Sequence, residues 1–166
     1  MPPSPIVRPA ELAHGAHGHG TGFAARTASL TAPFGGRHLG ARHVELPAGK
    51  AGWPFHCHHA NDELFVILSG SGLLRHGAET HPVTAGDVIV CPAGGAATAH
   101  QLRAGADGPL AFLAISSLRE PDVMEYPDSG KVTVFAGAPP GGRAAERSLS
   151  LTVKAASAVD YWLDED

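Results

Sequence analysis

Residues 52–70 read GWPFHCHHANDELFVILSG, and the interpretation of the whole chain depends on them. One residue separates His56 from His58, so on a β-strand their side chains share a face while Cys57 points the other way. A polar turn then leads to Glu63, which opens the apolar run LFVIL and a second predicted strand. An antiparallel return of this strand would bring Glu63 close to both imidazoles. Two neutral imidazoles and one carboxylate make a metal site of the kind that binds non-haem Fe(II) and related ions.

The spacing His-x-His-x4-Glu-x6-Gly, from His56 to Gly70, resembles the first motif of the cupin superfamily. Downstream, GDVIVCPAG at residues 86–94 resembles the start of the second cupin motif, Gly-x5-Pro-x-Gly. That motif usually places a histidine three residues after its last glycine, but here the interval to His100 is six residues, and the asparagine usual four residues later is Ala104. The resemblance therefore implies a three-residue insertion in this turn and His100 as a fourth metal ligand.

Short strands with glycine-containing turns between them predict an all-β fold, either a sandwich or a barrel. The resemblance narrows this to a double-stranded β-helix, the jelly-roll barrel of cupins. Within residues 63–69, Phe65 and Ile67 share the parity of Glu63 and are expected to face inward, whereas Leu64, Val66 and Leu68 are expected to face outward. Strands are expected near residues 38–46, 53–58, 63–69, 72–76, 87–91, 97–103 and 110–117.

We divide the chain into three parts. Residues 1–36 are rich in Pro, Gly, Ala and His without sustained periodicity, which predicts an irregular N-terminal arm. Residues 37–118 are expected to form the cupin β-barrel core. Residues 119–166 are a C-terminal extension with a short strand at KVTVF. Because Tyr161 and Trp162 require burial, we expect this extension to pack on the barrel or on a partner subunit.

The composition restricts the partners and the compartment. A formal net charge of -4 argues against nucleic acid or an anionic membrane as the main partner, and no apolar run approaches the ~20 residues that span a bilayer. The first residues do not read as a signal peptide, and two cysteines are too few for a secreted disulfide framework, so a cytoplasmic protein is expected. The uninterrupted apolar run LFVIL requires cover on both faces, for which a homodimer is the simplest explanation.

The strings FHCHHANDE and EPDVMEYPDSGKV are similar to single-domain bacterial cupins that are sometimes labelled sugar-phosphate isomerases. The resemblance implies one divalent transition metal, Fe, Mn, Ni, Co or Zn, which His56, His58, Glu63 and His100 bind. Its Lewis acidity would serve isomerisation or epimerisation of a small polar substrate, such as a sugar, a sugar phosphate or an oxo-acid. An Fe(II)-dependent dioxygenase and a non-catalytic small-molecule-binding cupin remain alternatives. No catalytic base is assigned.

Other polar residues have a simple structural interpretation and a functional one. His59 follows His58, so we expect it to face away from the metal site as a surface or turn residue. Cys57 and Cys91 are expected to be small buried hydrophobes. Four residues lie on predicted strands, where exposure on a sheet face is the simpler interpretation and binding of a carboxylate or phosphate in the cavity is the alternative. They are Arg42, His43, Arg75 and Arg103.

Overall fold

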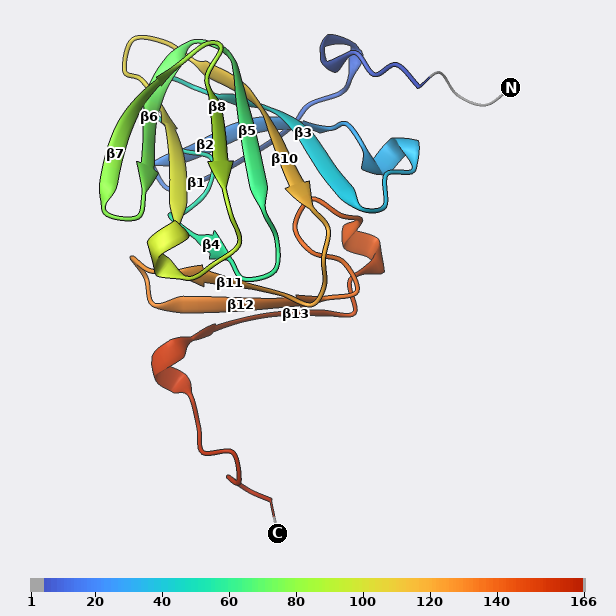
Figure 1. Cartoon of the computed structure of the whole chain (residues 1–166), viewed down its shortest axis with the longest axis vertical. Coiled ribbons are helices and arrows are strands. Elements are labelled where there is room, and N and C mark those ends of the chain that lie inside the picture. The colour runs from blue at the N-terminus through green and yellow to red at the C-terminus, as the bar shows by residue number, and fades with distance from the viewer. Residues whose placement is uncertain (1–4, 166) are drawn as a thin grey trace.

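Antiparallel strands make up most of the regular structure of residues 5–165, the part of the chain that the computed structural model describes (Figure 1). The predicted all-β fold is therefore confirmed. No helix in this part of the chain has the length and hydropathy to span a membrane. The helices are single 3-10 turns: η1 (Pro9–Glu11), η2 (Ala32–Phe34), η3 (Ala96–Thr98), η4 (Ala144–Glu146) and η5 (Ala155–Ser157).

A six-stranded sheet forms one wall of the molecule. Its strands, in spatial order, are β1 (Gly15–His19), β2 (Phe23–Ser29), β3 (Leu39–Leu46), β10 (Leu110–Ser117), β5 (Glu63–Ser69) and β8 (Val88–Cys91). Phe65 and Ile67 of β5 are 7% and 1% exposed, whereas Leu68 is 44% exposed. The predicted alternation of this strand is thus confirmed. Alternate residues of a strand lie on opposite faces of its sheet, so one face of β5 lines the core.

Two smaller sheets lie across the core from the large one. The first contains β7 (Glu79–Thr84), β6 (Ser71–His76) and β9 (His100–Ala104). The second contains β13 (Leu149–Lys154), β12 (Lys131–Ala136), β11 (Asp122–Tyr126) and β4 (Cys57–His58). A backbone bridge between His56 and His100 connects the two. The largest fully buried apolar side chains, among them Phe112 and Ile67, lie in the enclosed space.

The expectation of an irregular arm over residues 1–36 is wrong for residues 15–29. These residues form the β1–β2 hairpin, and β2 pairs with β3 at the edge of the large sheet. Ala25 and Ala28 are buried there, at 2% and 3% exposure. Alanine and glycine give little hydrophobic contrast, so a strand made mainly of them shows no clear period in the sequence.

Two strand boundaries also differ from the prediction. Residues 53–58 contribute only the short strand Cys57–His58, because Pro54 has no backbone N–H to donate to a sheet. The strand expected at residues 97–103 begins at His100, since residues 96–98 form the helical turn η3. The structure also contains three strands that are not expected from the sequence, β7, β11 and β13.

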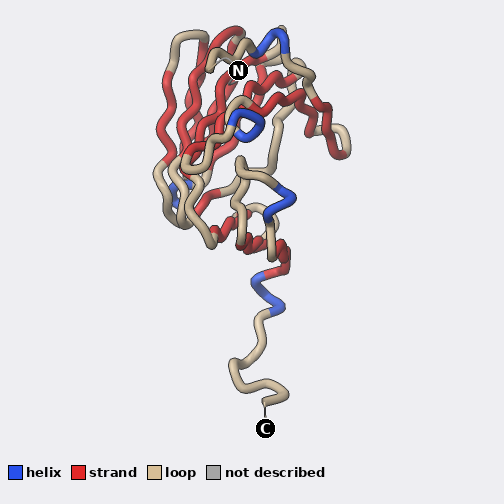
Figure 2. Tube along the Cα trace, turned by 90° about the vertical axis from the view of Figure 1, so that its right-hand side faces the viewer, coloured by secondary structure: helices blue, strands red, loops and turns tan. Residues whose placement is uncertain are grey.

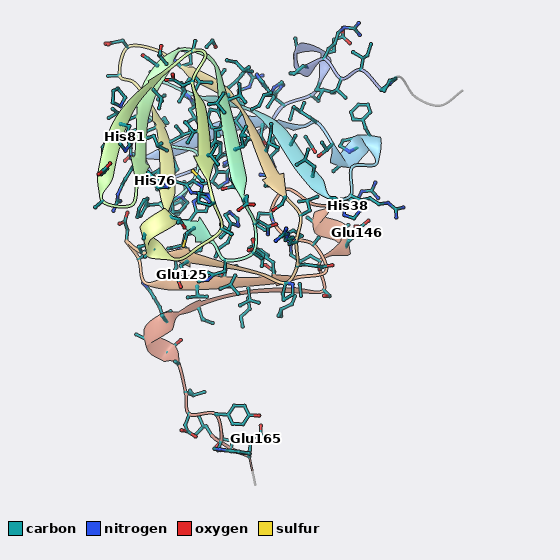
Figure 3. The ribbon with its side chains drawn as sticks, in the orientation of Figure 1. His38, His76, His81, Glu125, Glu146 and Glu165 are labelled. Atoms are coloured by element: carbon teal, nitrogen blue, oxygen red, sulfur yellow. The ribbon has the colours of Figure 1, made fainter. Side chains whose placement is uncertain are left out.

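The chain after β13 runs away from the sheets (Figure 2), and Glu165 lies near its far end (Figure 3). Tyr161 and Trp162 are 84% and 70% exposed and contact each other edge to face, with ring centroids 4.9 Å apart. The expectation that these aromatics pack on the chain's own barrel is therefore wrong. The physical reason is topological: β13 is the outer strand of its sheet, so the chain leaves the molecule there.

The two glycines that end the first cupin-like motif and begin the second both have positive φ, +83° at Gly70 and +97° at Gly86. Their surroundings differ. A Cβ added at Gly70 would overlap the backbone carbonyl of Pro109, whereas nothing lies within 4 Å of a Cβ at Gly86. Gly70 therefore has a steric requirement that Gly86 lacks.

We expect Gly86→Ala to lower the free energy of unfolding by about 1–2 kcal/mol, from backbone strain alone. Gly70→Ala should cost about 1–3 kcal/mol more, because the Pro109 carbonyl must also move. Urea denaturation of both variants measures the difference. Equal losses in the two variants would contradict the close approach of Pro109 to Gly70.

Candidate metal centre

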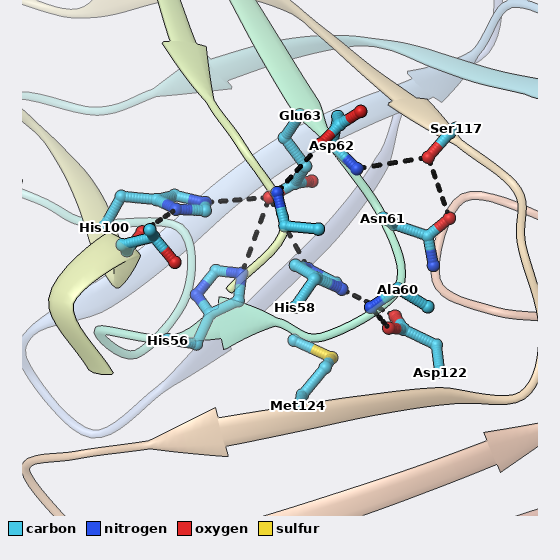
Figure 4. A network of polar contacts seen from close by, with 12 residues as sticks. His56, His58, Ala60, Asn61, Asp62, Glu63, His100, Ser117, Asp122 and Met124 are labelled. Carbon is cyan, nitrogen blue, oxygen red and sulfur yellow. Dashed lines mark hydrogen bonds and ion pairs between the residues drawn. The ribbon is translucent and has the colours of Figure 1, made fainter. Parts of the chain in front are cut away.

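The four predicted metal ligands come together between the sheets (Figure 4). The Nε2 atoms of His56, His58 and His100 all lie near one atom, Oε2 of Glu63, at 3.9, 3.5 and 2.7 Å. Two ligand atoms about 2.1 Å from a shared ion, at right angles to each other, are about 3 Å apart. The donor set therefore fits a divalent transition metal in chemistry, and the ligand atoms of His56, His58 and Glu63, all within 4.8 Å of one another, also fit it in spacing. The binding of a metal by these four residues stays a prediction.

The other ring nitrogen of each histidine has an acceptor. Nδ1 of His58 donates to Oδ2 of Asp122 over 2.6 Å, and Nδ1 of His56 donates to the carbonyl of Pro54 over 2.7 Å. Nδ1 of His100 lies 3.3 Å from the carbonyl of Thr98. A histidine whose Nδ1–H is engaged in this way presents the Nε2 lone pair to a metal. The surrounding protein thus orients all three rings toward Glu63.

Asp122 was not identified from the sequence. It lies on β11, is completely buried, and also accepts a hydrogen bond from the backbone N–H of Ala60 at 3.2 Å. A buried carboxylate on the far side of a ligand histidine fixes the ring and raises its basicity. Only the pairing of β11 with β4, in which Met124 lies opposite His58, brings Asp122 to this position. The C-terminal extension is therefore part of the site.

His100 reaches the site despite the longer turn before it. Residues 96–98 form the helical turn η3, whose last residue supplies the carbonyl near Nδ1 of His100. His100 and His56 then exchange two backbone hydrogen bonds, of 3.2 and 2.8 Å. The implied three-residue insertion is absorbed before the strand begins, so His100 is held beside His56 by the backbone itself.

The predicted antiparallel return of the Glu63 strand beside the histidine strand is wrong. β4 pairs with β11, while β5 pairs with β10 and β8, so Glu63 approaches the imidazoles from the opposite sheet. The connecting loop is fixed by Asn61, which is 2% exposed. Its side-chain oxygen accepts from the N–H of Arg119 at 2.7 Å and from the hydroxyl of Ser117 at 3.0 Å. These bonds hold the loop in place between the two ligand strands.

Burial and mutual contact change the acidity of the cluster in the metal-free state. Burial lowers the pKa of His56 to about 4, so this ring is neutral at pH 7. Burial would also lower the pKa of His100, but its hydrogen bonds with Cys91 and Glu63 outweigh this effect and raise the pKa. Burial alone would raise the pKa of Glu63. The hydrogen bond from His100 and the electrostatic effect of the neighbouring imidazoles outweigh burial and lower this pKa. A metal must therefore displace the proton of His100, which makes metal binding tighter as the pH rises.

The four polar residues on predicted strands differ in whether they line the cavity of the site. Arg75 makes two hydrogen bonds to Asp128, of 2.7 and 2.9 Å, on the surface. Arg103 donates to the carbonyl of Gly49, and Nδ1 of His43 lies 2.8 Å from a nitrogen of His14. All three are half-buried, and none of them is among the residues that line the cavity, so the structure gives no support to a binding role for them. Arg42, in contrast, lines the cavity of the site.

His59 and the cysteines lie where the sequence places them. His59 faces away from the site and bonds Glu125 over 2.9 Å at the surface. Cys57 and Cys91 are each 1% exposed and unpaired. Because His59 is adjacent to His58 but lies outside the cluster, it provides a matched control for mutagenesis.

A cavity of about 100 Å³ adjoins the histidine cluster. Its apolar wall combines side chains of the large sheet with one from β9, one from the loop before β4 and one from the C-terminal extension. It is formed by Trp53, Phe65, Leu102, Phe112, Ala114 and Met124. The polar groups are the three histidines, Arg42 and Ser116. An apolar cavity with a few convergent polar groups is the usual form of a small-molecule site.

The family model described as the cupin domain matches residues 42–116. This stretch contains His56, His58, Glu63 and His100, together with the strands that carry them. Residues 42–116 therefore match the cupin domain, in agreement with the two motifs that they contain.

Solved structures agree on the fold. A protein from Acidithiobacillus ferrooxidans, provisionally named a sugar phosphate isomerase, superposes with a TM-score of 0.70 at 24% identity, covering 90% of this chain and 88% of that one. A sugar phosphate isomerase of the cupin superfamily from Silicibacter pomeroyi gives 0.67 at 22% identity, covering 81% and 78%. A predicted oxalate decarboxylase from Thermotoga maritima gives 0.57 at 22% identity, covering 69% and 99%. Among proteins with curated descriptions, none matches the sequence.

We expect His58→Ala to reduce bound metal from about one ion per chain to nearly none, because the buried Nε2 ligand is lost. His59→Ala should retain the wild-type content. Element-resolved mass spectrometry after gel filtration measures both variants, and circular dichroism checks their folding. Equal metal content in folded wild type and His58→Ala would rule out this ligand set.

Asp122→Asn should weaken metal affinity by about 10–100-fold, because the amide supports the His58 ring less strongly than the carboxylate does. Glu125→Gln, on the same strand but at the surface, should leave affinity unchanged. Competition with a chromogenic chelator gives both affinities. If the two variants weakened the metal equally, the hydrogen bond from His58 to Asp122 would have no specific role.

Proposed function

We propose that this cupin is a metal-dependent isomerase or epimerase of a small polar metabolite, such as a sugar, a sugar phosphate or an oxo-acid. The observation that carries the proposal is the convergence of three Nε2 atoms on one oxygen of Glu63 beside an apolar cavity. His56, His58, Glu63 and His100 would hold one divalent transition metal. When bound, such an ion supplies Lewis acidity that polarises a carbonyl group.

The protein itself supplies orientation and exclusion of water. The hydrogen bond from His58 to Asp122 keeps one ring fixed in a completely buried setting. Phe65 and Phe112, whose rings contact each other at 5.8 Å, form the wall behind the site. Low polarity around a reacting carbonyl strengthens the electrostatic effect of every fixed charge near it. These features favour chemistry on a carbonyl compound over simple storage of a ligand.

Two of the similar structures carry the name sugar phosphate isomerase, and this name agrees with the proposed class of reaction. Their identity to this chain is 24% and 22%, so the likeness itself concerns the fold. The substrate class of the present chain therefore depends on its own cavity.

We also propose that the protein is a cytoplasmic homodimer. Val88 and Val90 on β8 are 59% and 65% exposed and lie opposite Val66 and Leu64 of β5 in the sheet. Together with Leu68 they make an apolar strip on the outer face of the large sheet, which a second copy would cover. The two free cysteines agree with a reducing compartment.

The test is isomer interconversion by metal-loaded protein in D2O, followed by NMR with aldose and ketose sugars, their phosphates and oxo-acids. We expect deuterium to enter the carbon next to the carbonyl, and we expect His58→Ala and chelator treatment to abolish this. Turnover that consumes O2 and stops under anaerobic conditions would replace the proposal with a dioxygenase. A ligand that binds and is recovered unchanged would favour the binding protein.

A further inference from the structure

Arg42 occupies an interior position of β3. It shares the parity of Val44 and Leu46, both completely buried, and it lines the cavity together with His56 and His58. A strand residue with this parity points between the sheets rather than to solvent. The guanidinium therefore lines the same cavity as the histidines of the candidate metal centre.

The charge of Arg42 has no direct partner in the protein. Within residues 5–165, its guanidinium makes no hydrogen bond and no ion pair within 4.0 Å, although this group carries five N–H donors. Burial is the main cause that lowers its pKa; the charge of Glu63 raises the pKa and that of Arg147 lowers it. A half-buried cation without a bonded partner costs free energy unless an anion compensates it.

The charges around the cavity indicate which ligand compensates Arg42. Glu63 and Asp122 contribute one negative charge each, and both are already engaged with histidines. A divalent ion would balance these two charges, which leaves Arg42 uncompensated. Among the described residues, those that line the cavity include no side-chain carboxylate. Because the walls are apolar, that remaining positive charge is poorly screened and attracts an anion.

We propose that Arg42 binds an anionic group of the substrate, a carboxylate or a phosphate, and so selects acidic metabolites over neutral sugars. The planar guanidinium matches both groups with two parallel N–H···O bonds. This inference deepens the proposed function and rests on it, because it assigns the substrate class of the same cavity.

The test uses two pairs of probes that differ by one anionic group. Lactate and malate share a hydroxy-carboxylate, and malate adds a carboxylate; glycerate and 3-phosphoglycerate differ by a phosphate. Isothermal titration of zinc-loaded wild-type protein should show a preference of about 10–100-fold for the member with the additional anionic group in at least one pair. A preference within the first pair assigns a carboxylate, and one within the second assigns a phosphate.

Arg42→Gln should abolish the preference while metal content stays at the wild-type level. Arg42→Lys keeps the charge without the two-pronged geometry, so it should retain part of the preference. This variant keeps the inference testable if Arg42→Gln does not fold. Arg103→Gln is the matched control, because Arg103 lies on β9 and bonds Gly49 instead of lining the cavity. It should keep the full preference.

Two results overturn the inference: no preference in either pair for the wild type, or a preference that survives in folded Arg42→Gln. Neither result argues against the metal centre, provided that the wild type and Arg42→Gln both still bind zinc. If the wild type holds no zinc, the proposed function fails instead. The same titrations on metal-free protein then still decide whether Arg42 selects anions.

Discussion

The carboxylate oxygen of Glu63, faced by three imidazole nitrogens from the opposite side of the core, is the contact on which the rest of the structure depends. Glu63 is carried by the large sheet, and the histidines are carried by β9 and by residues 56–58. The two walls must therefore be held at a fixed separation for the cluster to form. A rigid β-sandwich core, with Phe112 and Ile67 fully buried, supplies that separation.

Three separate devices keep the cluster oriented. The backbone bridge to His56 sets the position of His100, the buried Asn61 fixes the loop before Glu63, and Asp122 fixes the ring of His58. Two of these depend on the part of the chain after residue 116, since Asn61 bonds Arg119 and Asp122 lies on β11. The C-terminal extension is thus a structural support of the site as well as an addition to the barrel.

Local patterns in the sequence predicted the elements that are rich in large apolar residues and bounded by turns. The bounds expected for residues 63–69 and 110–117 match β5 and β10, and the motif spacing located the four candidate ligands. Asp122 could not be found in this way, because it lies 64 residues from His58 and meets it only through strand pairing. The β1–β2 hairpin was missed because alanine and glycine give no hydrophobic period. The exposure of Trp162 was missed because the need to bury a ring does not say which surface covers it.

The most direct test of the account is a crystal structure of the metal-loaded protein, with anomalous diffraction collected at the absorption edge of the bound ion. We expect one strong peak about 2.0–2.2 Å from the Nε2 atoms of His56, His58 and His100 and from a carboxylate oxygen of Glu63. A peak elsewhere, or a metal-soaked crystal with no peak at this cluster, would contradict it.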